Sequence, residues 1–208
     1  MSEADPNWPE LAASTRDVYA RHAARFDAER PRHLHERVWL ERFAALLPEA
    51  GAVLDLGCGA GEPIAGWLIR SGFRVTGVDA AAPMLAIARR RYPDGDWRQA
   101  DMRSLDLASR FNGIIGWDSF FHLRPDEQRT TLHRLANHLL PRGALMLTVG
   151  PEAGEVTGTV ADEPVYHSSL APEAYKAILA DAGLDIVQFV KEDPNCDLHT
   201  ILLAQMRA

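Results

Sequence analysis

The residues best suited to chemistry are a glycine-rich segment and an aspartate that follows it. Residues 55–61 read DLGCGAG, between a predicted buried strand and the start of a predicted helix. Glycines permit a tight turn and let a ligand approach the backbone closely, and the helix start offers unpaired N–H groups. Asp79 stands 22 residues after Gly57, at the end of the next predicted strand. An acid at that offset can accept hydrogen bonds from both hydroxyls of a ribose, so the pattern indicates a nucleotide-like ligand.

The spacing of the glycines discriminates between nucleotide ligands. They fall as GxGxG, and Glu62 stands where a dinucleotide-binding loop carries its third glycine. This counts against NAD, so a nicotinamide oxidoreductase is the weaker alternative. A tight turn followed by a solvated aspartate is the purely structural explanation.

Several segments resemble the class I S-adenosylmethionine (SAM)-dependent methyltransferases. Residues 53–61 resemble motif I of that family, and residues 75–79 resemble the segment that follows it. The other matching segments resemble motif II (99–102), motif IV (111–123) and the turn into the fifth strand (140–145). With the last pair of predicted strands, the resemblance covers about residues 52–206.

The resemblance implies that SAM is the cofactor and indicates which residues hold it. The implied cofactor-binding residues are Asp55, Gly57, Gly59, Gly61, Asp79, Ala80, Met84, Asp101, Met102 and Trp117. The three glycines would pass the methionine moiety, Asp79 would hold the ribose, and Asp101 would accept a hydrogen bond from the adenine amino group. Met84 would pack near the adenine, although core packing explains it equally well.

The residues after the predicted strand 113–117 are the first place to look for a base. Methyl transfer needs an approach of about 3–3.5 Å, and a hydroxyl or ammonium acceptor must also lose a proton. His122 is the candidate base, and its alternative is a histidine that holds the loop through a backbone hydrogen bond. Asp118 either orients the SAM amino group or caps the turn. Tyr19 resembles the aromatic residue in the amino-terminal lid of many small-molecule methyltransferases, with core packing as its alternative.

Residues 150–170 show no clear period, contain three glycines and follow a strand at the same predicted sheet edge. A structureless segment of this length is usually functional or disordered. We expect it to form the acceptor pocket together with the amino-terminal helices, with Tyr166, His167 and His199 as candidate substrate contacts. An ordinary surface excursion is the alternative. No spacing of histidines, cysteines and carboxylates suggests a metal site.

Alternating strands and helices position these residues. The predicted strands cover 52–56, 74–78, 97–100, 113–117, 144–149, 184–190 and 198–204, and the predicted helices include 11–28, 33–47, 82–92 and 172–182. Short connections between them favour a doubly wound, mostly parallel seven-stranded α/β sheet of Rossmann-like methyltransferase type. We expect one domain over 1–208, with a helical lid at 1–50 and a SAM-binding core at 51–208.

The composition of the chain limits the classes of molecule that it is expected to bind. The net charge of −7 makes the chain repel polyanions on average, so we expect neither nucleic acid nor a membrane as a partner. Two cysteines and no apolar run between Met1 and Arg30 favour a reducing, cytoplasmic location. We expect a monomer or homodimer that methylates oxygen or nitrogen of a small-molecule acceptor. A non-catalytic SAM-binding module is the alternative.

Overall fold

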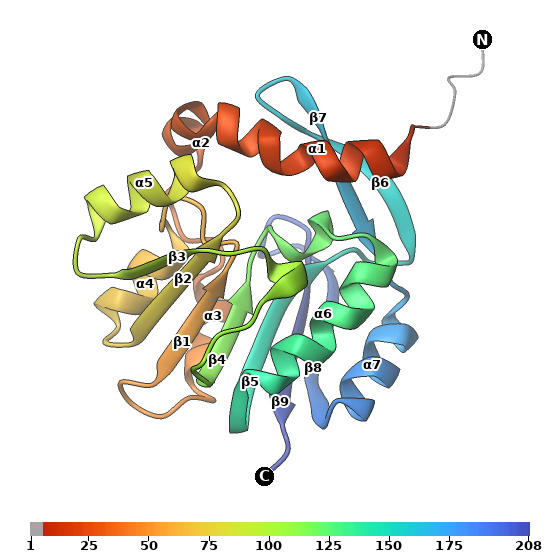
Figure 1. The fold of residues 1–208 in the computed structure, drawn as a ribbon. Helices are drawn as coiled ribbons and strands as arrows, with labels where there is room; N and C mark the ends of the chain where they lie inside the picture. Colours follow the sequence, from red (N-terminus) through yellow and green to blue (C-terminus); the bar gives the residue numbers. More distant parts are fainter. Residues whose placement is uncertain (1–5) are drawn as a thin grey trace.

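The centre of the molecule is a seven-stranded sheet with the order β3-β2-β1-β4-β5-β9-β8. The computed structural model describes residues 6–208. The strands are β1 (Ala52–Leu56), β2 (Arg74–Asp79), β3 (Asp96–Gln99), β4 (Phe111–Gly116), β5 (Leu139–Val149), β8 (Leu184–Asp193) and β9 (His199–Met206). All neighbouring strands are parallel except β9, which is antiparallel to both β5 and β8. The predicted fold class is therefore confirmed (Figure 1).

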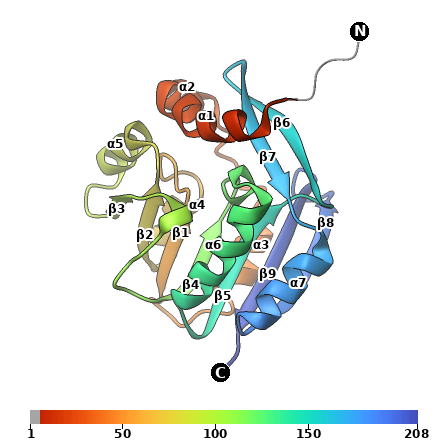
Figure 2. The same cartoon turned by 45° about the vertical axis from the view of Figure 1, so that its right-hand side comes forward.

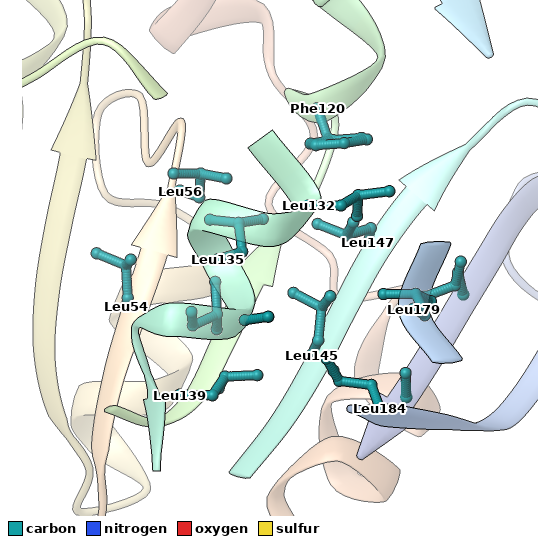
Figure 3. Packing of buried hydrophobic residues seen from close by; sticks show 14 of the residues in the cluster. Leu54, Leu56, Phe120, Leu132, Leu135, Leu139, Leu145, Leu147, Leu179 and Leu184 are labelled. Atoms are coloured by element: carbon teal, nitrogen blue, oxygen red, sulfur yellow. The ribbon is translucent and has the colours of Figure 1, made fainter. Parts of the chain in front are cut away.

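Helices cover both faces of this sheet. The helices α6 (Pro125–Asn137) and α7 (Pro172–Asp181) cover one face, and α3 (Arg37–Ala44), α4 (Ile64–Arg70) and α5 (Ala82–Arg91) cover the other. Side chains alternate along a strand, so Leu54 of β1 packs under α6 while the adjacent Val53 packs under α3 and α4. Leucines dominate the cluster under α6 and α7 (Figure 3). Each fully buried side chain of this size contributes about 1.5–3 kcal/mol.

Two helices lie across the carboxyl ends of the parallel strands and form the lid. The predicted helix 11–28 is two helices, α1 (Trp8–Arg21) and α2 (Ala23–Glu29), with a break at His22, whose φ and ψ are not helical. In Figures 1 and 2 they lie above the sheet, beside α5.

The predicted lid of residues 1–50 is too long. The second predicted helix, 33–47, is the shorter α3 and packs on a face of the sheet, where Trp39, Leu40 and Phe43 are at most 1% exposed. Its apolar stripe requires burial, and the sheet face that carries Val53, Ile115 and Met146 supplies the apolar surface on which it packs. Residues 1–5 of the predicted lid lie outside the described residues.

Residues 150–170 are not structureless, so that prediction is wrong. They form the antiparallel hairpin of β6 (Gly154–Val160) and β7 (Glu163–Ser169), separate from the main sheet. Ala161 and Asp162 connect the strands with φ of 50° and 71°, which suits a tight two-residue hairpin turn. The sequence shows no strand period because adjacent residues of β7, Val165 and Tyr166, are both fully buried, while most of β6 is exposed.

Candidate functional site

A large cavity lies between the carboxyl edge of the sheet and the lid. The space between its lining residues, counted together with the solvent at its open mouth, is about 1230 Å³. Eleven of the predicted site residues line the cavity: Tyr19, Asp55, Gly57, Gly59, Asp79, Ala80, Met84, Asp101, Met102, Trp117 and His122. Four predicted site residues are absent from its lining: Gly61, Tyr166, His167 and His199.

The three glycines of the loop after β1 are required for different structural reasons. A Cβ on Gly57 would lie 2.3 Å from the Cβ of Ser119, so only glycine fits there. A Cβ on Gly59 would meet nothing within 4 Å, which leaves room for a ligand against the backbone. A Cβ on Gly61 would approach the Trp97 ring to 3.1 Å. Packing against Trp97 explains the glycine at this position, and Gly61 is outside the cavity lining, so its contact with the cofactor stays a prediction.

Asp79 ends β2 and binds the loop as well as lining the cavity. Its Oδ2 accepts a hydrogen bond from the Gly59 N–H at 2.8 Å, and its Oδ1 accepts one from the Ala81 N–H at 2.7 Å. Burial raises the pKa of Asp79, and these backbone donors oppose the rise. The carboxylate therefore holds the Gly59 turn in place at the position predicted for a ribose.

Asp55 lies beside the cavity with an unpartnered oxygen. The residue is 3% exposed, and among the described residues its Oδ2 has no hydrogen-bond partner. Burial, together with the negative charge of Asp79, raises the pKa of Asp55 to about 7. A buried carboxylate without a partner fits a cationic group, and SAM carries an ammonium and a sulfonium. With the open space at Gly59, the residues present fit SAM.

The predicted adenine contacts are partly engaged within the protein. Asp101 accepts hydrogen bonds from the Arg103 side chain, at 2.6 Å between Oδ2 and Nη2, and from the Arg103 N–H. An adenine amino group would have to share this carboxylate with Arg103. Met84 is 1% exposed and packs with Ala81 in a small cluster, so it belongs to both the core and the cavity wall.

His122 lies in the short 3₁₀ turn Phe120–His122 after β4 and contacts the lid. Its Nδ1 donates to the Tyr166 carbonyl at 2.8 Å, since a carbonyl only accepts. Its Nε2 then accepts from the Tyr19 hydroxyl at 3.0 Å. Burial lowers the pKa of His122 to about 4. This geometry fits the loop-holding alternative, and the assignment of His122 as a base stays a prediction.

Asp118, His199 and Arg30 form a charged network that the sequence reasoning did not assemble. His199 Nε2 donates to Asp118 Oδ1 at 2.8 Å, and His199 Nδ1 donates to the Cys196 carbonyl at 2.9 Å. Arg30 follows α2, lines the cavity and lies 3.5 Å from Asp118 Oδ2. The hydrogen bond to Asp118 raises the pKa of His199 to about 9. Burial acts to raise the pKa of Asp118, but His199 and Arg30 outweigh it and the pKa is lowered.

The hairpin supports the lid from outside the cavity. Tyr166 is fully buried, its N–H is held by Thr15 of α1, and its hydroxyl donates to Glu155. His167 packs against the rings of Phe121 and His122, with centroids 4.6 Å and 5.0 Å away. The prediction that residues 150–170 line the acceptor pocket is therefore wrong for the cavity described.

Ionic and apolar contacts join the hairpin to α1 and α2. Glu163 pairs with Arg21 and His22, and Arg25 pairs with Asp162 at 3.0 Å. Val18 of α1 is buried against Val160 and Val165. The hairpin therefore fixes the lid over the cavity.

Within residues 6–208, no cluster of three or more potential metal-ligating side chains is present. No helix among these residues is long and apolar enough to cross a membrane.

Comparisons with known proteins agree with this site. A family model described as a methyltransferase domain matches residues 53–143. The chain is 33% identical over 176 residues to the trans-aconitate 2-methyltransferase of Azoarcus sp. (strain BH72), covering 70% of this chain and 68% of that protein. It is 38% identical over 102 residues to the dTDP-3-amino-3,6-dideoxy-alpha-D-glucopyranose N,N-dimethyltransferase of Streptomyces fradiae, covering 48% of this chain and 40% of that protein.

A solved structure shares the fold at low sequence identity. The Burkholderia thailandensis 1,6-didemethyltoxoflavin-N1-methyltransferase has a TM-score of 0.75 and 21% identity, over 100% of this chain and 94% of that one.

The strand order, the glycine loop and the cavity above it define a Rossmann-like nucleotide-binding enzyme of the methyltransferase fold. With the relatives above, the chain belongs to the class I SAM-dependent methyltransferases, and SAM is its cofactor.

Proposed function

We propose that this enzyme transfers the SAM methyl group to an oxygen or nitrogen of a small molecule that enters the cavity beneath α1 and α2. The observation that supports the proposal is that residues of the sheet edge and residues of the lid line one and the same cavity. Gly59 and Asp79 line it from the sheet, and Tyr19, Phe26 and Arg30 line it from the lid. A ligand held by the loop and a second ligand under the lid would therefore meet in one cavity.

Residues at the sheet edge would hold the cofactor. Bound SAM supplies an electrophilic methyl group on a positively charged sulfur. Asp79 would accept from the ribose, and Asp55 would pair with a positive charge. Arg30 is a candidate for the cofactor carboxylate, because it is a cavity-lining guanidinium whose nearest partner is 3.5 Å away.

The lid favours a small acceptor. It is fixed to α5 by the ion pair of Asp27 and Arg91 at 2.8 Å and to the hairpin by Glu163. A macromolecule would have to displace these contacts, and the net charge of −7 disfavours nucleic acid. The names of the relatives, which specify trans-aconitate and an amino sugar, support the same size class. A cytoplasmic monomer or homodimer remains our prediction.

The non-catalytic alternative predicts SAM binding without acceptor space, and the lining of the same cavity by Phe26 and Arg30 of the lid region favours the enzyme. The test uses SAM labelled on the methyl group, with separate low-molecular-mass, protein and tRNA fractions of a bacterial extract. We expect label in the low-molecular-mass fraction only, and about tenfold less or lower with Asp79→Ala when SAM is kept below the wild-type Kd. Label in protein or tRNA would contradict a small acceptor, and SAM binding without transfer to any fraction would favour the module.

A further inference from the structure

Asp118 presents a carboxylate to the cavity from the end of β4. The Asp118 side chain is 28% exposed, and the residue lines the cavity. The Asp118 N–H donates to Thr148 Oγ1 at 2.8 Å, and Oδ1 is held by His199 at the same distance. The backbone has a φ of 51°, which is uncommon for a residue other than glycine. Rigid contacts therefore fix this carboxylate and leave Oδ2 free for a hydrogen bond, because Arg30 at 3.5 Å is too distant for a good one.

The neighbours of Asp118 keep it ionised. Both ring nitrogens of His199 face groups that only accept hydrogen bonds, namely a carbonyl and a carboxylate. Both nitrogens therefore carry protons, and the ring is an imidazolium. With Arg30 on the other side, Asp118 has positive charge near both oxygens. An anion held in this way is a good hydrogen-bond acceptor and a poor base.

The other polar groups near Tyr19 are also poor bases. His122 Nε2 already accepts a hydrogen bond from the Tyr19 hydroxyl, and burial lowers the pKa of this ring to about 4, so it takes up a proton poorly. Burial and the negative charge of Asp118 raise the pKa of the Tyr19 hydroxyl. A hydroxyl acceptor, which must lose its proton as it attacks, would find no ready base beside Asp118, since Asp55 in the same cavity is assigned to the positive charge of the cofactor.

We propose that the acceptor is an amine and that Asp118 Oδ2 accepts a hydrogen bond from its N–H. The inference rests on the proposed function and names the substrate class of the same cavity. A carboxylate acceptor fits less well, since it would bring a further negative charge beside Asp118, and Arg30 is already assigned to the cofactor carboxylate.

The transfer step balances without a protein base. The neutral amine nitrogen gives its lone pair to the methyl carbon, the carbon–sulfur bond breaks, and the bonding pair stays on sulfur. The nitrogen then carries the positive charge until it releases a proton to water. Asp118 faces this developing charge, and a fixed anion in that place stabilises the transition state more than the neutral ground state.

The test uses acceptors that differ only in the reacting group. Benzylamine, benzyl alcohol and benzoate form one set, and glucosamine, glucose and glucuronate form another. S-adenosylhomocysteine formation reports turnover, and calorimetry with S-adenosylhomocysteine-loaded protein reports acceptor binding. We expect the amines to bind and react, with kcat/KM rising with pH towards the pKa of each amine.

Variants then assign the role of Asp118. Asp118→Asn should raise the Kd and KM of the amine by about tenfold or more, as expected for loss of a charged hydrogen-bond partner, while the SAM Kd stays within about twofold. Asp185→Asn is the control, because this exposed carboxylate lies on β8, pairs with Arg207 and is outside the cavity lining.

Three results would overturn the inference. Turnover of the alcohols or carboxylates with inert amines would overturn it and leave the proposed function standing. Weakened SAM binding by Asp118→Asn would also overturn it, because the carboxylate would then serve the cofactor. SAM binding without turnover of any member would count against both proposals and favour a non-catalytic module.

Discussion

Replacing Asp79 with alanine tests the cofactor site most directly. The carboxylate lines the cavity and accepts hydrogen bonds from two backbone N–H groups, at 2.8 Å from Gly59 and 2.7 Å from Ala81. The substitution therefore removes the predicted ribose partner and two supports of the loop together. These two effects have different observables, so one variant can report both.

The expected magnitudes follow from these contacts. A hydrogen bond to a charged group contributes about 1.5–3 kcal/mol, so loss of the ribose partner should weaken SAM binding by about tenfold to a hundredfold. Each buried N–H left without a partner costs about 1–3 kcal/mol, so Asp79→Ala should also lower the unfolding midpoint. Asp79→Asn keeps the shape and one acceptor oxygen, and it should lie between wild type and alanine in both measurements.

Calorimetry with SAM measures the affinity after thermal unfolding has shown that the variant is folded. Asp96→Ala is the matched control, because this carboxylate begins β3 and binds Thr76 and Arg98, outside the cavity lining. It should leave the SAM Kd unchanged. A folded Asp79→Ala protein with wild-type SAM affinity would refute the assignment of Asp79 to the ribose.

The remaining predictions concern pH and the lid. Because the pKa of Asp55 is raised to about 7, this carboxyl must lose a proton before it pairs with a cation. SAM affinity should therefore rise between about pH 6 and 8 and level off above pH 8. A wild-type affinity that is flat over this range, or an Asp55→Asn variant that keeps the rise, would speak against the pairing. The folded pKa of His199 is raised to about 9, so its stabilising contribution is full below the unfolded pKa of about 6.5 and is lost as pH rises through 9. The difference in unfolding free energy between wild type and His199→Phe, measured with urea, should therefore shrink over that interval, and a constant difference would contradict it. Tyr19→Phe and His122→Asn each remove one hydrogen bond of the lid and should each lower turnover about two- to tenfold; a loss of about 10²–10⁴-fold for His122→Asn alone would instead support a base. Replacing residues 154–162 with a short glycine–serine linker should spare SAM binding, speed amide exchange in α1 and impair turnover, because Val18 loses its support from Val160. Unchanged exchange and wild-type turnover would place the support of the lid elsewhere.

The sequence pattern located most of the sheet because its signal is local. Strands β1, β2 and β4 are short apolar runs bounded by glycine or charged residues, and every predicted strand overlaps an observed one. The hairpin escaped detection because β7 is buried on two sides and β6 is exposed on most of its length. The apolar stripe of α3 was recognised, but a stripe does not specify which surface will cover it.

The sequence by itself determined the cofactor half of the site. A glycine loop between strand and helix, with an aspartate at the end of the next strand, is specified within about 25 residues, since loop and strand geometry depend on local backbone freedom. Only the tertiary structure decided the acceptor half. Asp118 and His199 are 81 positions apart, and Tyr19 and His122 are 103 apart. These pairs meet because β4, β5 and β9 are neighbours in the sheet and because the hairpin holds α1 over their ends. Contacts at such separations arise from the packing of whole elements, and no local periodicity encodes them.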